Sequence, residues 1–216
     1  MSESKPAIVQ KFLKFGTLEN LLKLRAGQVH MKTLGYFRDL EEKDGRGDSY
    51  EALTTHLQPG QFRLGFRTST SDEIFEVTEL IAKPLRIWAN TDVHVFCMTA
   101  LTVQYLEEQA RVGAPIIGER LKALSNYVLE ISPKPFMDRM TQAAAAAGFK
   151  TDWGVVKYYN PALYHGEIDY FDKRSSYDWQ MEARIVADPS GNDHMNIELG
   201  SLEDISILKT FANPKA

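Results

Sequence analysis

The sequence feature that most constrains the fold is the apolar run at residues 93–99, Val-His-Val-Phe-Cys-Met-Thr. The run is continuous rather than alternating, which is typical of a central strand that is buried on both faces of a sheet. Cys97 lies inside it and is the single cysteine among 216 residues. We interpret Cys97 as an inert thiol rather than a nucleophile, and one cysteine excludes an internal disulfide or a multi-cysteine metal site.

The rest of the chain alternates short strands with short helices. After a strand at 7–15, Thr17 is a candidate helix N-cap and Gly27 is the expected left-handed residue that ends the helix. A second strand covers 29–37. Helices are also predicted at 104–112, 116–127 and 134–148, and strands at 62–66, 74–81, 85–89, 127–131, 155–159, 166–170, 183–187, 195–199 and 205–209. This pattern predicts a single α+β domain over residues 1–216, with a mostly antiparallel or mixed sheet and about four helices.

Composition is that of an ordinary globular protein, with 44% hydrophobic and 25% charged residues. The formal net charge of −4 argues against a strongly basic nucleic-acid clamp but allows a local basic cleft. The first five residues are polar, and no apolar stretch approaches the roughly 20 residues that cross a membrane. We therefore expect a cytoplasmic protein without membrane contact. The five histidines lack zinc-site spacing, so no metal is expected.

The densest group of candidate functional residues lies at 170–186. Gln180, Glu182 and Arg184 are spaced by two, so on a strand their side chains all point to one face. Glu182 is the strongest candidate, either as an acid or base in a partly apolar cleft or as a partner in a cross-strand salt bridge. Arg184 can bind a phosphate through two hydrogen bonds or can pair with Glu182. Lys173, in the loop before them, either meets a phosphate or is solvated.

Two further segments carry polar candidates. In the charged loop at 39–51, Arg46 with Asp48 and Glu51 can clamp a ligand, or these residues can pair internally and hold the loop. Ser69 begins a Ser-Thr-Ser run that can hold a ribose hydroxyl, although such runs are usually turns. Aromatic residues, among them Tyr36 and Tyr177, are interleaved with these groups. A base or nicotinamide ring can stack on such residues, although we expect most of them in the core.

Taken in order along the chain, these segments resemble a broad group of bacterial and phage domains of unknown function. The shared pieces are a strand ending in Lys-Phe with a Leu-rich helix and a second strand, an Arg-x-Asp-x-x-Glu loop, a Phe-Cys-x-Thr strand, and a closing set of Val-x-Tyr, Phe-x-Lys and Gln/Glu-x-Glu-x-Arg. In this chain they lie at residues 12–37, 46–51, 96–99, 156–158, 171–173 and 180–184. Each motif is short, and their shared order over most of the chain carries the resemblance.

The same opening and closing plan is similar to ADP-ribosyltransferases, in which a first strand and helix cradle NAD and a late Gln/Glu-x-Glu strand supplies the catalytic carboxylate. The resemblance implies that Glu182 orients the nicotinamide ribose and stabilises an oxocarbenium-like transition state, while Gln180 positions the acceptor. Lys14 stands nearest to the place where those enzymes have an Arg or a His. The implied cofactor-binding residues are Lys14, Tyr36, Arg46, Asp48, Glu51, Ser69, Lys173, Tyr177 and Arg184.

The leading functional prediction is therefore an ADP-ribosyltransferase-like enzyme of bacterial or phage origin. It would cleave the nicotinamide glycosidic bond of NAD and pass ADP-ribose to a nucleic acid, a protein or water, and Glu182→Gln would abolish activity with little change in melting temperature. The alternative is a non-catalytic module that binds a nucleotide or a protein in phage–host conflict. An Arg or His facing Glu182 from the first strand favours catalysis, and a Lys or an apolar residue favours binding. A third class, a metal-dependent nuclease, needs clustered carboxylates such as those at 39–48.

Overall fold

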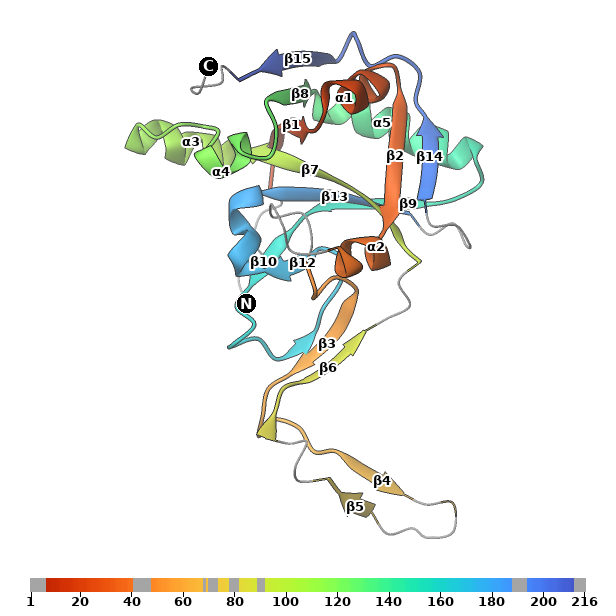
Figure 1. Cartoon of the computed structure of the whole chain (residues 1–216), viewed down its shortest axis with the longest axis vertical. Helices are drawn as coiled ribbons and strands as arrows, with labels where there is room; N and C mark the ends of the chain where they lie inside the picture. The colour runs from red at the N-terminus through yellow and green to blue at the C-terminus, as the bar shows by residue number, and fades with distance from the viewer. Residues whose placement is uncertain are drawn as a thin grey trace.

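The computed structural model describes residues 7–40, 48–67, 69, 74–77, 82–88, 92–187 and 194–211. Within them, the largest unit is an eight-stranded sheet (Figure 1) made of β1 (Val9–Phe15), β2 (Gln28–Thr33), β7 (His94–Thr102), β8 (Tyr127–Ile131), β9 (Thr151–Val155), β13 (Glu182–Ala187), β14 (His194–Glu198) and β15 (Ser206–Thr210). Six of these strands follow the order β14-β2-β7-β1-β8-β15, and β13 joins β7 to β9. Arg46 lies outside the described residues.

Strand β7 is the centre of this sheet. It pairs with β2 at residues 94 and 95, with β1 at residues 99 to 102, and with β13 over residues 94 to 99. Because a strand has two edges, β1 and β2 share one edge of β7 and β13 occupies the other. Most side chains of β7 are buried. The prediction of a central strand buried on both faces is confirmed.

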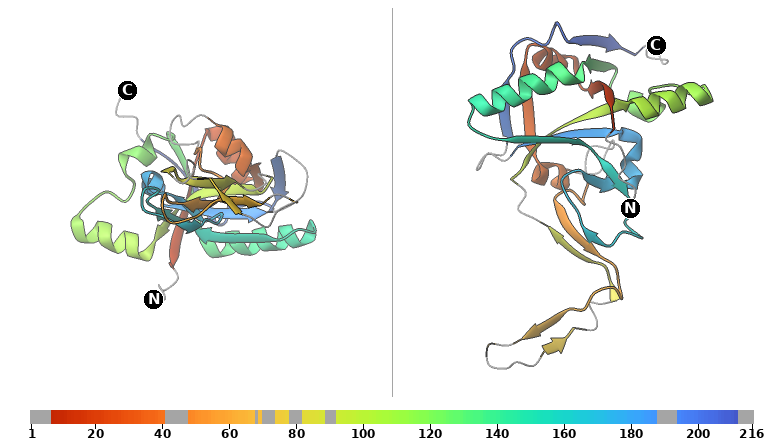
Figure 2. Two further views of the ribbon diagram at one scale, coloured as in Figure 1. Left: turned by 90° about the horizontal axis from the view of Figure 1, so that it is seen from below. Right: turned by 180° about the vertical axis from the view of Figure 1, so that it is seen from behind.

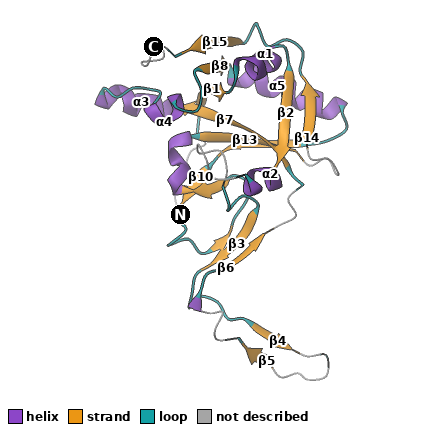
Figure 3. Ribbon diagram, viewed as in Figure 1, coloured by secondary structure: helices purple, strands orange, loops and turns teal. Residues whose placement is uncertain are grey.

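Helical segments flank the sheet (Figure 3): α1 (Leu18–Arg25), α2 (Leu34–Asp39), α3 (Val103–Val112), α4 (Glu119–Lys122), α5 (Pro133–Ala146) and the 3₁₀ segment η3 (Ser175–Gln180). The described residues thus contain six helical segments, where about four were expected. All strand pairs among these residues are antiparallel except β10 (Lys157–Tyr159) with β12 (Asp172–Arg174). The α+β class with a mostly antiparallel sheet is confirmed.

Several predicted elements have the wrong extent. The strand at 62–66 is observed at Gly65–Arg67, and the strand at 166–170 covers only Gly166–Glu167. The strand at 29–37 ends at Thr33, because the Thr33 hydroxyl oxygen accepts a hydrogen bond from the Tyr36 amide (3.2 Å) and caps α2 instead. The helix at 116–127 shrinks to the four residues of α4, whose N-cap is Gly118 without a side-chain cap. The strand at 155–159 divides at Val156 into β9 and β10, which belong to different sheets.

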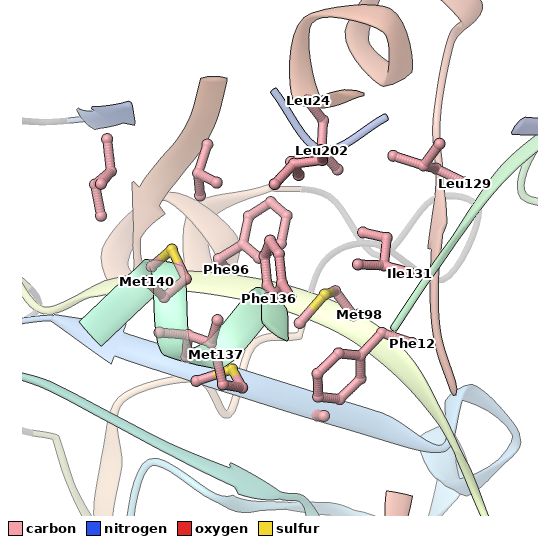
Figure 4. Close-up of a cluster of buried hydrophobic side chains, with 14 of the residues drawn as sticks. Phe12, Leu24, Phe96, Met98, Leu129, Ile131, Phe136, Met137, Met140 and Leu202 are labelled. Atoms are coloured by element: carbon pink, nitrogen blue, oxygen red, sulfur yellow. The ribbon is translucent and has the colours of Figure 1, made fainter. Parts of the chain in front are cut away.

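The main hydrophobic core lies where α5 packs against the sheet (Figure 4). Phe136, Met137 and Met140 follow the three- and four-residue spacing of one helix face, and all three are buried. The Phe136 ring meets the Phe12 ring of β1 and the Phe96 ring of β7, each at 6.2 Å between centroids. Burying each such side chain contributes roughly 1.5–3 kcal/mol. This packing fixes β1 and β7, which carry part of the site described below.

A second β unit projects from the main sheet (Figures 1 and 2). Its inner part pairs β3 (Leu53–Leu57) with β6 (Leu85–Trp88) and β11 (Gly166–Glu167), and its outer part pairs β4 (Gly65–Arg67) with β5 (Ile74–Glu76). Ser69 follows β4 and is exposed. The antiparallel β4–β5 pair therefore carries Ser69 away from the main sheet, and the structure does not bring it to the other predicted ligand-binding residues.

Candidate functional site

A pocket of about 1220 Å³ opens beside the main sheet, bounded by β1, α1, β2, α2, β7 and the start of β13. Its volume exceeds the roughly 300–1,000 Å³ typical of small-molecule sites. Apolar lining comes from residues such as Leu13, Phe15 and Leu21. Among the described residues, cations and carboxylates of similar number also line it: Lys14, Lys23, Lys32, Lys173, Arg184, Asp39, Glu51, Glu182 and Glu198. The pocket therefore offers both signs of charge and apolar surface to one ligand.

Arg184 organises the charged floor of this pocket. Its side chain is only 2% exposed, and its guanidinium donates from Nε to Glu182 Oε1 (2.6 Å), from Nη2 to Glu51 Oε1 (2.5 Å) and from Nη1 to the Tyr170 carbonyl (2.8 Å). Gly154 lies opposite Arg184 on β9, and a side chain there would meet the Phe171 ring at 3.1 Å. A glycine at this position thus allows the segment that carries the Tyr170 carbonyl to approach Arg184 closely.

Lys173, on β12, contacts the same carboxylates as Arg184. Its Nζ donates to Glu182 Oε2 (2.7 Å) and to Gln180 Oε1 (2.9 Å), and it lies 3.6 Å from Glu51 Oε1. Its ammonium also lies over the Tyr177 ring, 4.9 Å from the centroid. The floor network, defined as Glu51, Lys173, Glu182 and Arg184, contains two cations and two carboxylates and is neutral as a unit.

Each charge in the floor network is stabilised by its neighbours. Burial alone would raise the pKa of Glu182, but Arg184 and Lys173 outweigh it and hold that pKa well below the ordinary range. Burial would likewise lower the pKa values of Arg184 and Lys173, but Glu182 and Glu51 raise both above their ordinary values. Glu182, Lys173 and Arg184 are therefore charged at neutral pH, and none of these three groups is poised to exchange a proton there.

The prediction that Gln180, Glu182 and Arg184 lie on one face of a strand is wrong for Gln180. Gln180 ends η3, and Met181 adopts a left-handed conformation (φ 45°) before β13 begins. Gln180 still reaches the floor network through Lys173. Glu182 and Arg184 do share the pocket side of β13, while Ala183 between them and Ile185 after Arg184 point into the main core.

Tyr158 contacts Glu182 but was not among the site residues predicted from the sequence. Its hydroxyl oxygen accepts a hydrogen bond from the Glu182 backbone amide (2.8 Å). Burial raises the pKa of Tyr158, and the charge of Glu182 adds to this effect. The Val-x-Tyr motif at 156–158 was the available signal, but a tyrosine that anchors a backbone amide looks the same in sequence as a core aromatic.

The β1 wall of the pocket carries Lys14 and Leu13. Lys14 Nζ donates to the Cys97 carbonyl (2.6 Å) and lies 4.3 Å from the centroid of the Phe96 ring. The register aligns Leu13 with Thr99, and Thr99 with Glu182 across β7, so Leu13 is the first-strand residue in the row of Glu182. An apolar residue in that row, with a lysine next to it, is the arrangement expected for binding rather than catalysis.

The remaining predicted residues occupy different places. Tyr36, on α2, lines the pocket and is 45% exposed. Asp48 is buried and pairs with Arg174 (Oδ1 to Nη2, 2.5 Å), whose Nη2 also lies 3.3 Å from the Tyr177 hydroxyl. Asp48 and Tyr177 are not among the lining residues. They form a supporting layer behind Lys173, so the structure brings them to the floor network but not to the pocket surface.

Cys97 lies on the pocket wall. Burial, with the charge of Glu182 adding to it, raises the pKa of its thiol to about 12. A thiol with so high a pKa is a poor nucleophile at neutral pH.

No protein-family model, curated protein or solved structure matches this chain. The resemblance to ADP-ribosyltransferases therefore stays a prediction. Over the ranges that the structure describes, no three His, Cys, Asp or Glu side chains gather as a metal site. None of the helices in those same ranges is long and apolar enough to cross a membrane.

Proposed function

We propose that the pocket binds a nucleotide and that the chain acts as a nucleotide-binding module. The observation that carries this proposal is the closed floor network: both carboxylate oxygens of Glu182 already accept a hydrogen bond from a cation. Buried, mutually paired charges hold one geometry, so the ligand meets a preorganised surface. Acid–base catalysis, by contrast, needs a group that titrates near the working pH. Of the two functions expected from the sequence, capture without bond cleavage is the better supported.

A nucleotide fits the chemistry of the lining. Lys14 and Lys32 place ammonium groups on the β1 and β2 walls, where they can attract phosphate. Tyr36 exposes an aromatic ring on which a base can stack. Carboxylates such as Glu51 and Glu198 can accept hydrogen bonds from ribose hydroxyls. A concave pocket of this volume also suits a dinucleotide such as NAD better than the flat surface of a protein partner.

The test is isothermal titration of the full chain with NAD, ADP-ribose, ADP and free ribose 5-phosphate. We expect saturable binding of at least one adenine nucleotide at micromolar concentration. Ribose 5-phosphate serves as the matched control, because it keeps the phosphate and the sugar but lacks the base. If none of the three nucleotides binds, the proposal is wrong.

A second candidate is the ADP-ribosyltransferase-like activity, and the observation that favours it is the permanent charge of Glu182 on the pocket floor. An ionised carboxylate needs no proton transfer to stabilise an oxocarbenium-like centre or to orient a ribose hydroxyl. In this candidate the ADP-ribose passes to water, a protein or a nucleic acid. The Leu13–Thr99–Glu182 row weighs against it.

Release of nicotinamide separates the two candidates. The chain is incubated with NAD, and nicotinamide is measured by liquid chromatography, with and without a cell extract as a source of acceptors. Binding of NAD without any release supports the binding module. Release above the level of a Glu182→Asp variant, which keeps the charge and displaces the carboxylate, would make the transferase the correct function.

A further inference from the structure

One edge of β7 is unpaired between β1 and β2. β7 pairs with β2 up to Val95 and with β1 from Thr99 onward, and within the described residues neither strand pairs with Cys97 between them. In Figure 1, β1 lies toward one end of β7 and β2 toward the other, and α1 connects them. Beyond the paired rows, β1 stays with β8 and β2 stays with β14. The two strands therefore diverge at Cys97, and we call this unpaired row of β7 the sheet gap.

The backbone of Cys97 points into the sheet gap. The Ala100 amide donates to the Met181 carbonyl, just before β13, so Ala100 turns its N–H toward β13. Successive residues of an antiparallel strand turn their N–H and C=O groups to alternate edges, and Cys97 is an odd number of residues away. Its N–H and C=O groups therefore point toward β1 and β2. The Cys97 carbonyl accepts a hydrogen bond from Lys14 Nζ on β1 (2.6 Å), which agrees with this direction.

The sheet gap has the chemistry of an anion site. The register gives the Cys97 N–H no partner from β1 or β2, although a backbone N–H away from water nearly always has one. The N–H and C=O groups of one residue leave the strand on the same edge, so the Lys14 ammonium lies beside this N–H. A backbone N–H next to a cation is a favourable place for a phosphate oxygen. Cys97 and Lys14 both line the pocket.

We propose that the sheet gap binds a phosphate of the nucleotide, with one oxygen accepting from the Cys97 N–H and the charge facing Lys14. This inference rests on the proposed nucleotide-binding function and assigns its phosphate subsite. The pocket then selects nucleoside diphosphates, and dinucleotides with a pyrophosphate, over nucleosides.

The surroundings of the sheet gap agree with a phosphate subsite. The Lys14 ammonium is held between the Cys97 carbonyl and the Phe96 ring, 4.3 Å from the ring centroid, so its charge is in place before a ligand arrives. Glu182 belongs to β13, on the other edge of β7. A phosphate in the sheet gap therefore lies across β7 from the strand that carries this carboxylate.

The single cysteine of the chain makes the Cys97 amide directly observable. Full-length protein grown with ¹⁵N-cysteine gives one backbone amide signal in a proton–nitrogen correlation spectrum. Saturating ADP is expected to move the Cys97 amide proton downfield, because a phosphate oxygen that accepts the proton deshields it. Adenosine keeps the base and the ribose but lacks the phosphates, and it is expected to leave the signal near its position in the free protein.

Lys14→Met tests the cation at the sheet gap, because methionine keeps an unbranched side chain and removes the charge. Isothermal titration is expected to show roughly tenfold or greater weakening of ADP, the size of a lost charge-assisted hydrogen bond, with adenosine changed by less than about twofold. Lys11→Met is the matched control on the same strand. Lys11 is 43% exposed, pairs with Glu130 and lies outside the pocket lining, so ADP binding should stay at the wild-type level. Circular dichroism checks that both variants fold.

The comparison of ADP with adenosine uses the wild-type chain and does not depend on either variant. If ADP binds but the Cys97 amide proton does not move, or moves equally with adenosine, the phosphate subsite is overturned and nucleotide binding stands. Equal loss of ADP affinity in Lys14→Met and Lys11→Met would overturn it as well. If no nucleotide binds the wild-type chain, this inference fails together with the proposed function.

Discussion

The Glu182→Gln substitution tests the floor network most directly. Glu182 is 4% exposed and receives hydrogen bonds from Arg184 Nε and Lys173 Nζ. The amide of glutamine has nearly the same shape but no charge, and only its oxygen can accept. Two buried cations would then share the single carboxylate of Glu51, and one donor would face an amide NH₂ group. The structure thus revises the expectation that this change leaves the melting temperature unaltered.

The magnitude follows from the burial of the partners. Arg184 and Lys173 are 2% and 7% exposed, so water cannot replace the lost carboxylate without rearrangement. Removing one member of a buried ion pair typically costs roughly 3–5 kcal/mol. For a chain of this size, each kcal/mol lowers the melting temperature by about 2–4 °C, which gives a drop of roughly 6–20 °C.

The assay is thermal and urea denaturation followed by circular dichroism, with Glu130→Gln as the matched control. Glu130 also holds two lysines, Lys11 at 2.7 Å and Lys209 at 2.6 Å, but their side chains are 43% and 52% exposed. Surface pairs of this kind contribute about 1 kcal/mol or less. If Glu182→Gln and Glu130→Gln shift the melting temperature equally, the Glu182 carboxylate is not needed to compensate the two buried cations.

The pH dependence of the same comparison gives an independent check. Because the folded protein lowers the pKa of Glu182, its stabilising contribution is complete above the ordinary value of 4.5 and is lost as the pH falls toward the folded value. The difference in unfolding free energy between the wild type and Glu182→Gln is therefore expected to stay constant from about pH 8 to about pH 5 and to narrow below that range. If the difference in unfolding free energy widened on acidification, Glu182 would not be the ionised group that stabilises the folded protein.

Two further predictions concern the pocket wall. Tyr36→Ala is expected to weaken nucleotide binding about fivefold to a hundredfold in isothermal titration, which is the range for loss of one stacked base. The melting temperature should not change, because the Tyr36 side chain is 45% exposed. An unchanged affinity would show that Tyr36 does not contact the nucleotide. Cys97 is expected to react with iodoacetamide at pH 8 roughly a thousandfold more slowly in the folded protein than in urea, because its pKa rises from 9.0 to about 12. Mass spectrometry measures both rates, and similar values would place a reactive thiolate on the pocket wall.

Part of this site was predictable from spacing alone. Glu182 and Arg184 are two residues apart, so any strand through them puts both on one face, and β13 does so. Their pairing was one of the two alternatives that the sequence left open. Lys173 and Glu51 could be listed as candidates, but no local pattern brings Glu51 to a guanidinium 133 residues away. That contact depends on the tertiary arrangement of the segment after residue 48.

Three of the errors in the fold share a physical cause. Thr33, Gly118 and Val156 each lie where the hydrophobic pattern continues but the backbone changes direction. At Thr33 a side-chain hydroxyl offers the helix amides a partner, and this local hydrogen bond outweighs β propensity. At Met181 a non-glycine residue takes a left-handed conformation, which sequence patterns rarely indicate. Periodicity detects burial better than it detects such turns.

The charge arrangement also indicates which way a nucleotide lies in the pocket. A phosphate that approached Lys173 would have to compete with Glu182 and would meet repulsion from Glu51, which lies 3.6 Å from the same ammonium. Hydroxyl groups meet no such repulsion, because they donate to carboxylate oxygens that retain unused lone pairs. The floor network therefore favours ribose hydroxyls, whereas Lys14 and Lys32 on the walls favour phosphate. A buried ion network generally adds little net stability compared with apolar packing. The orientation that it imposes on the ligand then explains why the chain has one here.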